Sequence, residues 1–231
     1  MLTAKEFVAK IEADNESLFR AGEMQIKAYY EKNAENKEEL IDNFTGRMVN
    51  ERMNMEEISR EVAAAAPGTD PEKLILLSKQ AHDEAKHFQF VKEVVEYLSG
   101  KEIDMQEAVE SHAKKLELKG AMLIKKYNCN SNPLMLGLYQ LLAEGRAARN
   151  WAMMAECIED KFISSRYAKI AKDEMFHATL GRMELEKLCD TQEAQDEINA
   201  VINDFRRDLY SINSKKTGVL PEAKKLMEVY A

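Results

Sequence analysis

The sequence predicts an all-α protein, and two observations support this. Prolines and glycines, which interrupt helices, number only four and nine among 231 residues. Apolar residues recur at steps of three and four over long stretches, as they do on the buried face of an amphipathic helix. A chain of this length can bury one large core, so we expect residues 1–231 to form a single domain.

The predicted helices follow one another with short breaks. Asp70 is the expected N-cap of the third helix, Pro71 its first residue and Gly100 its end. A turn at residues 218–221 precedes a short terminal helix. The predicted helices before the tail cover residues 3–32, 37–66, 71–99, 103–127, 133–159 and 162–189, and the tail at 191–231 holds one more long helix before that turn.

The composition limits the classes of function. A net charge of −8 and a pI near 5.3 argue against a general surface for nucleic acid or anionic membranes. No apolar run approaches the ~20 residues that span a bilayer, and the first residues are too charged for a signal peptide. The three cysteines are far apart and form no Cys-x-x-Cys motif. We therefore expect free thiols in a reducing cytoplasm.

Four of the helices carry ionisable residues inside an otherwise apolar stripe. Glu51, for example, is in phase with Met48 and Met55. A buried carboxylate is costly unless it is paired or binds a metal. The residues in such inward-facing positions are Glu51, Glu84, His87, Glu144, Glu174 and His177.

A short pattern, D-E-x-x-H, occurs twice, at residues 83–87 and 173–177. In each copy the glutamate and the histidine are three residues apart and share one helix face. A carboxylate and an imidazole on one face form half of a site for iron, manganese or zinc. Two copies therefore predict two metal ions. Matching residues around both copies indicate a weak internal repeat.

The lone glutamates lie level with the two motifs. Glu51 and Glu84 are about equally distant from the turn at Pro67, so they lie at the same height in an antiparallel pair that rises ~1.5 Å per residue. The second hairpin is expected to turn near Glu159, and Glu144 and Glu174 are equally distant from that residue. Glu56 is a rival to Glu51, but it points roughly 120° away from the stripe. The phase favours Glu51.

In these residues the chain resembles the ferritin-like di-iron carboxylate proteins. Their ligand set is one glutamate from each of two helices and Glu-x-x-His from each of the other two. The resemblance covers about residues 37–189 and implies an antiparallel four-helix bundle with extra N-terminal, crossover and C-terminal helices. It implies two iron ions, with manganese or one ion of each as alternatives. The implied ligands are Glu51, Glu84, His87, Glu144, Glu174 and His177.

The family also suggests roles for two aspartates. The residue before the glutamate of each motif often supplies a carboxylate to a ligand histidine, and Asp83 and Asp173 occupy these positions. Each can accept the free imidazole N–H and so fix the tautomer and orientation of the ring.

Small residues beside Glu144 predict a substrate pocket. Gly145, Ala148 and Ala152 leave volume near the metals, and Trp151 can form one wall. Close packing of two helices is the alternative interpretation of the same residues.

The expected function is that of an O2-activating di-iron oxygenase or oxidase acting on a small organic substrate. In architecture and ligands the chain most resembles the compact bacterial di-iron hydroxylases of the phenylacetyl-CoA and demethoxyubiquinone type, and it carries no substrate motif of theirs. The expected partners are O2, the substrate and an electron-donating reductase, and the expected assembly is a monomer or a homodimer. The alternative is a ferroxidase or iron-storage protein that forms a cage. A metal-free structural bundle would leave six buried ionisable residues without partners.

Overall fold

A computed structural model describes residues 1–115, 120–217 and 225. This part of the chain is all-α and contains no strand, which confirms the predicted class. The helices are α1 (Ala4–Asn33), α2 (Lys37–Ala64), α3 (Pro71–Ser99), α4 (Met105–Lys115), α5 (Gly120–Lys126), α6 (Pro133–Tyr139), α7 (Gly145–Cys157), α8 (Lys161–Leu188) and α9 (Gln192–Thr217), with a 3-10 turn at Cys129–Ser131 and a π-helical stretch at Gln140–Glu144.

Most helix boundaries agree with the sequence within a few residues, and one helix differs in kind. The helix expected over 133–159 is interrupted by the π-helical stretch at Gln140–Glu144, called the π segment below. Because a π turn places more residues in each turn than an α turn, it changes the phase of the residues that follow. The helix expected over 103–127 corresponds to α4 and α5. The turn at 218–221 and the terminal helix fall outside the described residues.

Side chains near the helix ends explain where several helices begin and stop. Thr3 and Glu6 form a reciprocal capping box at the start of α1. Asp70 accepts a hydrogen bond from the backbone N–H of Glu72, and Pro71 opens α3, as predicted. Gly100 ends α3 with a φ of 71°, a left-handed conformation that glycine adopts without a steric penalty.

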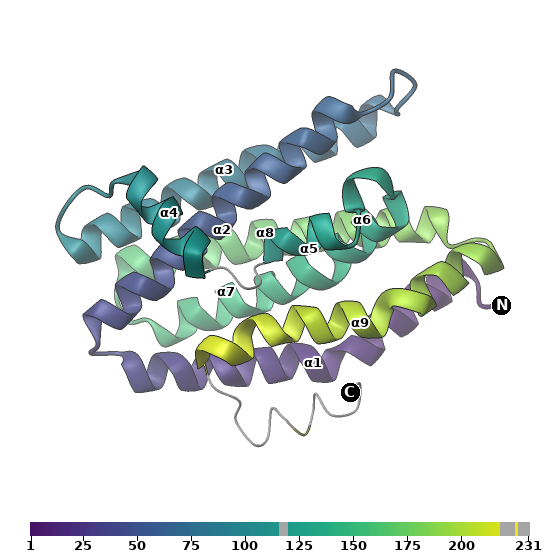
Figure 1. Ribbon diagram of the computed structural model, residues 1–231. Helices are drawn as coiled ribbons and strands as arrows, with labels where there is room; N and C mark the ends of the chain where they lie inside the picture. Colours follow the sequence, from purple (N-terminus) through teal and green to yellow (C-terminus); the bar gives the residue numbers. More distant parts are fainter. Residues whose placement is uncertain (116–119, 218–224, 226–231) are drawn as a thin grey trace.

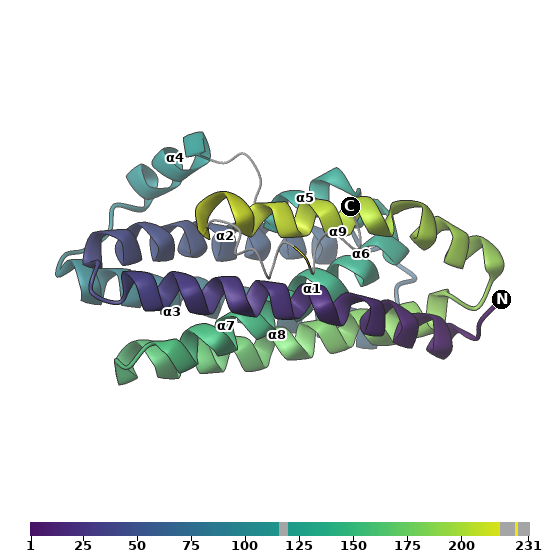
Figure 2. The ribbon, with the colours of Figure 1, turned by 90° about the horizontal axis from the view of Figure 1, so that it is seen from below.

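Two helical hairpins position the candidate site. α2 packs against α3, α7 packs against α8, and α8 joins the hairpins by packing against α3 (Figure 1). α8 also packs against α6 and the π segment. α1 and α9 lie side by side along the opposite edge of the molecule from α3 (Figures 1 and 2), with α1 against α7.

The apolar core is divided into two clusters, and the candidate site lies between them. On α3, Leu77 belongs to one cluster and Val91 to the other, and Glu84 lies between the two. On α8, Ile170 and Leu185 flank the second motif in the same way. Buried apolar side chains therefore close both ends of the polar centre and keep water away from it.

α8 approaches α6 and the π segment closely because residue 181 is a glycine. A Cβ atom on Gly181 would lie 2.5 Å from the backbone nitrogen of Leu141 and 2.6 Å from the carbonyl oxygen of Gly137. No side chain fits at that distance, so the two backbones are in direct contact. This contact holds the π segment, which ends at Glu144, against the helix that carries Glu174.

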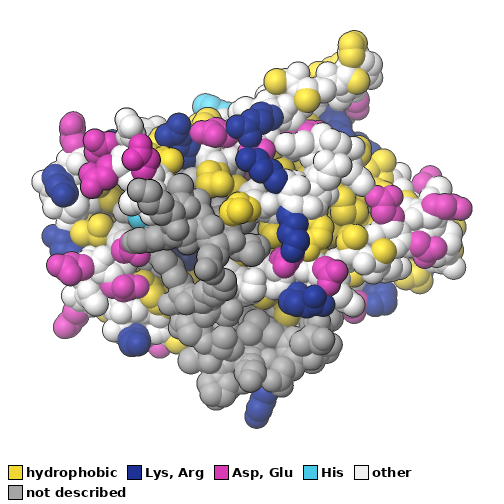
Figure 3. All heavy atoms as spheres, in the orientation of Figure 1, with side chains coloured by type: hydrophobic (Ala, Val, Ile, Leu, Met, Phe, Trp, Pro, Cys, Tyr) yellow, Lys and Arg dark blue, Asp and Glu magenta, His cyan; other side chains and the backbone are white. Residues whose placement is uncertain are grey.

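The surface carries both signs of charge. Figure 3 shows acidic and basic side chains spread across the described part of one face, with hydrophobic side chains between them. Among the described residues, no helix combines the length and the apolar character that crossing a bilayer requires.

Candidate metal centre

The structure brings all six predicted ligand residues together. Each is at most 3% exposed to solvent. Their donor atoms form two overlapping sets, and within each set all the atoms lie within 4.8 Å of one another. Glu84 and Glu174 belong to both sets. The first set adds Glu51 and His87, and the second adds Glu144 and His177.

Both imidazole rings turn the same nitrogen toward the carboxylates. Nδ1 of His87 lies 3.5 Å from Oε1 of Glu174 and 3.6 Å from the nearest oxygens of Glu51 and Glu84. Nδ1 of His177 lies 3.1 Å from Oε2 of Glu174 and 3.4 Å from Oε1 of Glu84. The Nδ1 atoms are therefore the donors that point into the centre.

The two aspartates cross between the motifs. Nε2 of His87 lies 3.5 Å from Oδ2 of Asp173, and Nε2 of His177 lies 3.5 Å from Oδ2 of Asp83. Each aspartate therefore faces the histidine of the other motif, a choice that the sequence left open. Asp83 precedes His87 on α3, whereas their partners come in the reverse order on α8, so α3 and α8 are antiparallel. An aspartate beside Nε2 favours the tautomer that leaves Nδ1 free to bind a metal.

The rival glutamate on α2 points away from the centre. The Glu56 side chain is 39% exposed and pairs with Arg52 and Arg60, at 3.2 and 3.8 Å. Glu51 is 3% exposed and lies in the first donor set. The predicted orientation of these two side chains is thus confirmed, whereas metal binding by Glu51 stays a prediction.

Two glutamines that the sequence analysis did not single out support Glu144. Nε2 of Gln80 donates a hydrogen bond to Oε1 of Glu144 at 3.2 Å. Nε2 of Gln140 in turn donates to Oε1 of Gln80 at 2.8 Å. Gln80 lies one helical turn before Glu84, on the same apolar stripe. An uncharged polar residue in that stripe was the signal that could have identified it.

Burial and neighbouring negative charges favour the protonated forms of the two lone glutamates, Glu51 and Glu144. Burial, together with the charges of Glu84 and Glu174, raises the pKa of Glu51 to about 7 and outweighs the contact with His87. The same burial and neighbouring charges raise the pKa of Glu144 well above its ordinary value. Without metal ions, the centre cannot hold all its carboxylates charged at neutral pH.

The pKa values of the two histidines and of Glu174 shift in the direction that favours their charged forms. Burial lowers the pKa of His177, but Asp83 and Glu174 outweigh it and raise the pKa to about 9. Burial likewise opposes the charge on His87, yet Asp173 and Glu174 raise its pKa well above the ordinary value. Burial raises the pKa of Glu174, but the two imidazoles lower it to about 2. These values describe the centre without metals.

Several donor atoms have no hydrogen-bond partner among the described residues. They are both carboxylate oxygens of Glu84, Oε2 of Glu51 and Nδ1 of His87. Leaving a charged group buried and unpaired costs several kcal/mol. Four carboxylates and two imidazoles have the charge and the donor types that suit two divalent transition-metal ions. The residues present therefore fit a dimetal centre.

The other histidines lie outside the centre, as predicted. His82 is exposed on α3. Nδ1 of His112 lies 3.1 Å from the carbonyl oxygen of Ala108 and 3.2 Å from Oγ of Ser111, as in a structural histidine.

The residues of the predicted substrate pocket lie in packed surroundings. A Cβ atom on Gly145 would lie 3.2 Å from Cζ of Phe19. The Trp151 ring packs 4.8 Å from the Tyr167 ring. Ala148 is 2% exposed, and Ala152 is half-buried. These contacts agree with the close-packing interpretation at Gly145 and Trp151, and a pocket beside Ala148 and Ala152 stays a prediction.

No family model, no curated protein and no solved structure matches this chain. A functional assignment therefore depends on the geometry of the centre.

Proposed function

We propose that the chain is a non-haem di-iron oxidoreductase that uses O2 to oxidise a small organic substrate. The observation that carries this proposal is the pair of overlapping donor sets that share Glu84 and Glu174. A lone glutamate from each of two helices and Glu-x-x-His from each of two others is the ligand set of ferritin-like dimetal proteins. In this proposal α2, α3, α8 and the continuous α6–α7 region form the ferritin-like bundle, and the other helices are additions.

Each ion would have its own ligands and would share two others. Glu51 and His87 would hold one ion, and Glu144 and His177 the other. Glu84 and Glu174, which belong to both donor sets, would help to hold each ion. Four carboxylates offset the charge of two divalent ions, and the imidazoles favour iron or manganese over calcium. Bound iron would supply the electrons that O2 requires.

The surrounding residues would prepare the centre for this chemistry. Asp83 and Asp173 lie 3.5 Å from the Nε2 atoms of His177 and His87, and these charges favour the ring orientation in which Nδ1 points inward. Lys79 and Lys86 pair with Asp83, and Lys79 and His177 together keep the pKa of this aspartate below its ordinary value despite burial. The apolar clusters on both sides exclude water, so charges in the centre interact strongly.

Iron uptake and O2 consumption test the proposal. Protein loaded with ferrous iron under nitrogen is expected to retain two ions per chain and to consume O2 when it is exposed to air. Zinc-loaded protein is the control, because zinc provides the same charge without redox chemistry. When excess iron and air are supplied, the iron content is expected to stay at two ions per chain. Continued accumulation of iron mineral would instead support the storage function.

Metal binding is expected to release protons and to strengthen as the pH rises. In the metal-free centre Glu51, with a pKa of about 7, and His177, with a pKa of about 9, carry protons at pH 6. Protons compete with the metal for these atoms, so each displaced proton should raise the affinity up to about tenfold per pH unit. Manganese titrations by calorimetry in two buffers of different protonation enthalpy measure the number released. The Glu51→Gln variant should release fewer protons, and equal heats in both buffers would contradict the expectation.

A further inference from the structure

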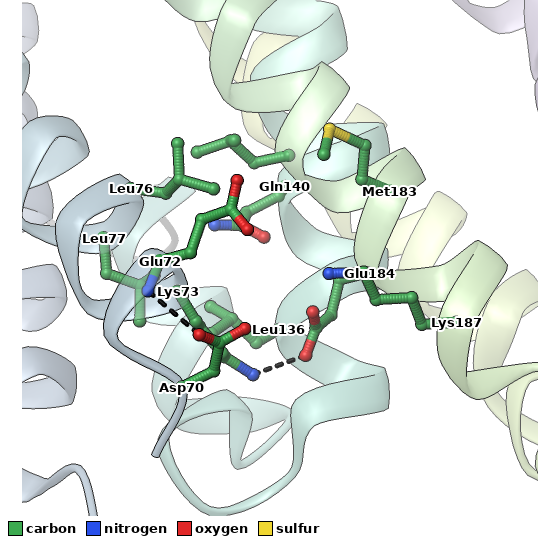
Figure 4. A pocket seen from close by; sticks show the side chains of 11 residues that line it. Asp70, Glu72, Lys73, Leu76, Leu77, Leu136, Gln140, Met183, Glu184 and Lys187 are labelled. Atoms are coloured by element: carbon green, nitrogen blue, oxygen red, sulfur yellow. Dashed lines mark hydrogen bonds and ion pairs between the residues drawn. The ribbon is translucent and has the colours of Figure 1, made fainter.

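A pocket between α3, α6, the π segment and α8 is lined by Gln140, one of the two glutamines that support Glu144 (Figure 4). Its empty space, including the part open to solvent, is about 520 Å³. Most of its wall is apolar, and Gln140 is the uncharged polar side chain that lines it. The apolar lining residues are Leu76, Leu77, Leu136, Leu180 and Met183.

Gln140 connects the pocket to the metal centre. It is 3% exposed, and its Nε2 donates to Gln80, which is fully buried and donates to Glu144. The amide of Gln80 turns its N–H toward Oε1 of Glu144 and its carbonyl oxygen toward Nε2 of Gln140. The carbonyl oxygen of Gln140 makes no hydrogen bond among the described residues. That oxygen can accept a hydrogen bond from a molecule in the pocket.

The connection reaches only one half of the centre. Residue 170 occupies the position in the second motif that corresponds to Gln80, and it is a fully buried isoleucine. An isoleucine side chain donates no hydrogen bond, and among the described residues Oε2 of Glu51 has no hydrogen-bond partner. The two halves of the internal repeat therefore differ at Gln80 and Ile170, and Gln80 is the one that is bonded to a residue of the pocket, Gln140.

The charges at the rim of the pocket are largely balanced. Lys73 pairs with Glu184 across the opening (Figure 4). The carboxylate of Asp70 caps α3. Glu72 and Lys187, both exposed, carry opposite charges. The rim thus favours neither an anion nor a cation, and the apolar wall favours an uncharged molecule.

We propose that this pocket binds a small, neutral, mostly apolar molecule through one hydroxyl group that donates a hydrogen bond to Gln140. Gln140 and Gln80 are positioning residues that connect this molecule to Glu144. The connection to chemistry rests on the proposed dimetal function, whereas the binding itself does not. The pocket gives the unknown substrate a chemical class: an aliphatic or aromatic alcohol.

Binding is tested on the metal-free protein with 1-hexanol as the probe. Met183 lines the pocket, whereas Met175, also exposed on α8, does not. In protein labelled with ¹³C in the methionine methyl groups, 1-hexanol should shift the Met183 resonance in a saturable way and leave that of Met175 in place. Hexanoate and hexylammonium should bind more weakly. The absence of a saturable shift at Met183 would overturn the proposal.

Two substitutions test the role of Gln140. Gln140→Leu removes one hydrogen bond and should weaken 1-hexanol binding about tenfold. Gln89→Leu is the matched control, because Gln89 is exposed on α3 and contacts Glu93 instead. Should the Gln140 variant fail to fold, Met183→Trp fills the pocket from its exposed side. That variant should abolish saturation transfer from the protein to the 1-hexanol methyl group. If whichever of these two variants folds binds 1-hexanol as tightly as the unmodified protein does, the assignment of the binding site to this pocket is overturned.

Cobalt absorption tests the connection to Glu144. In cobalt(II)-loaded protein, 1-hexanol should change the visible bands, since these report the ligand geometry. Gln80→Leu should remove this change and keep the shift at Met183. A spectral change that persists in Gln80→Leu would overturn the role of the two glutamines. If cobalt does not bind although Met183 responds to 1-hexanol, the dimetal proposal fails and the pocket stands.

Discussion

Replacing Glu84 with alanine is expected to abolish binding of both metal ions. Glu84 belongs to both donor sets, and it is fully buried beside His87 and His177. Without it, both ions lose a ligand and a neutralising charge in a site that excludes water. Glu51→Ala should lower the content only from two ions to one, since Glu51 belongs to a single set. Anaerobic dialysis against ferrous iron, followed by elemental analysis, measures both contents.

Glu56→Ala is the matched control for these two variants. It removes a carboxylate from the same helix as Glu51, but from its exposed face. Two ions per chain are expected to remain bound. Loss of metal from Glu56→Ala but not from Glu51→Ala would show that the donor sets are assigned to the wrong glutamate. Equal contents in Glu84→Ala and Glu51→Ala would contradict the shared role of Glu84.

Gly181→Ala is expected to destabilise the fold by about 3 kcal/mol, at the upper end of what overpacking usually costs. The added methyl group would lie 2.5 Å from a backbone nitrogen and 2.6 Å from a carbonyl oxygen. Backbone atoms cannot rotate away as a side chain can, so α8 and the π segment must separate. The expected fall in Tm is roughly 6–12 °C for a chain of this size. Thermal unfolding of the metal-free protein measures it.

Gly68→Ala provides the comparison for this substitution. An added Cβ at Gly68 meets no atom within 4 Å. Its stability should be unchanged or increased by about 0.4–1 kcal/mol, because alanine restricts the unfolded chain. The Gly181 variant should also bind metal more weakly, since the separated π segment carries Glu144. Equal Tm values for the two variants would contradict the direct backbone contact at Gly181.

The sequence alone predicted the features that depend on residues close together in the chain. The start and end of α3 follow from the cap at Asp70 and from Gly100, which act within a turn of the helix. The inward orientation of Glu51 and the outward orientation of Glu56 follow from helical phase. The convergence of the ligands at one height followed from symmetric spacing around the two turns. Each of these inferences needs only local geometry.

The tertiary structure decided the features that depend on contacts between helices. Asp83 faces His177 rather than its own motif because α3 and α8 are antiparallel neighbours, which spacing within one helix cannot show. The π segment arises where α8 packs directly on the backbone around Leu141, and no residue pattern marks it. The path from the pocket through Gln140 to Glu144 passes through Gln80, which is 60 residues from Gln140 and 64 from Glu144 in the chain, so only packing completes it.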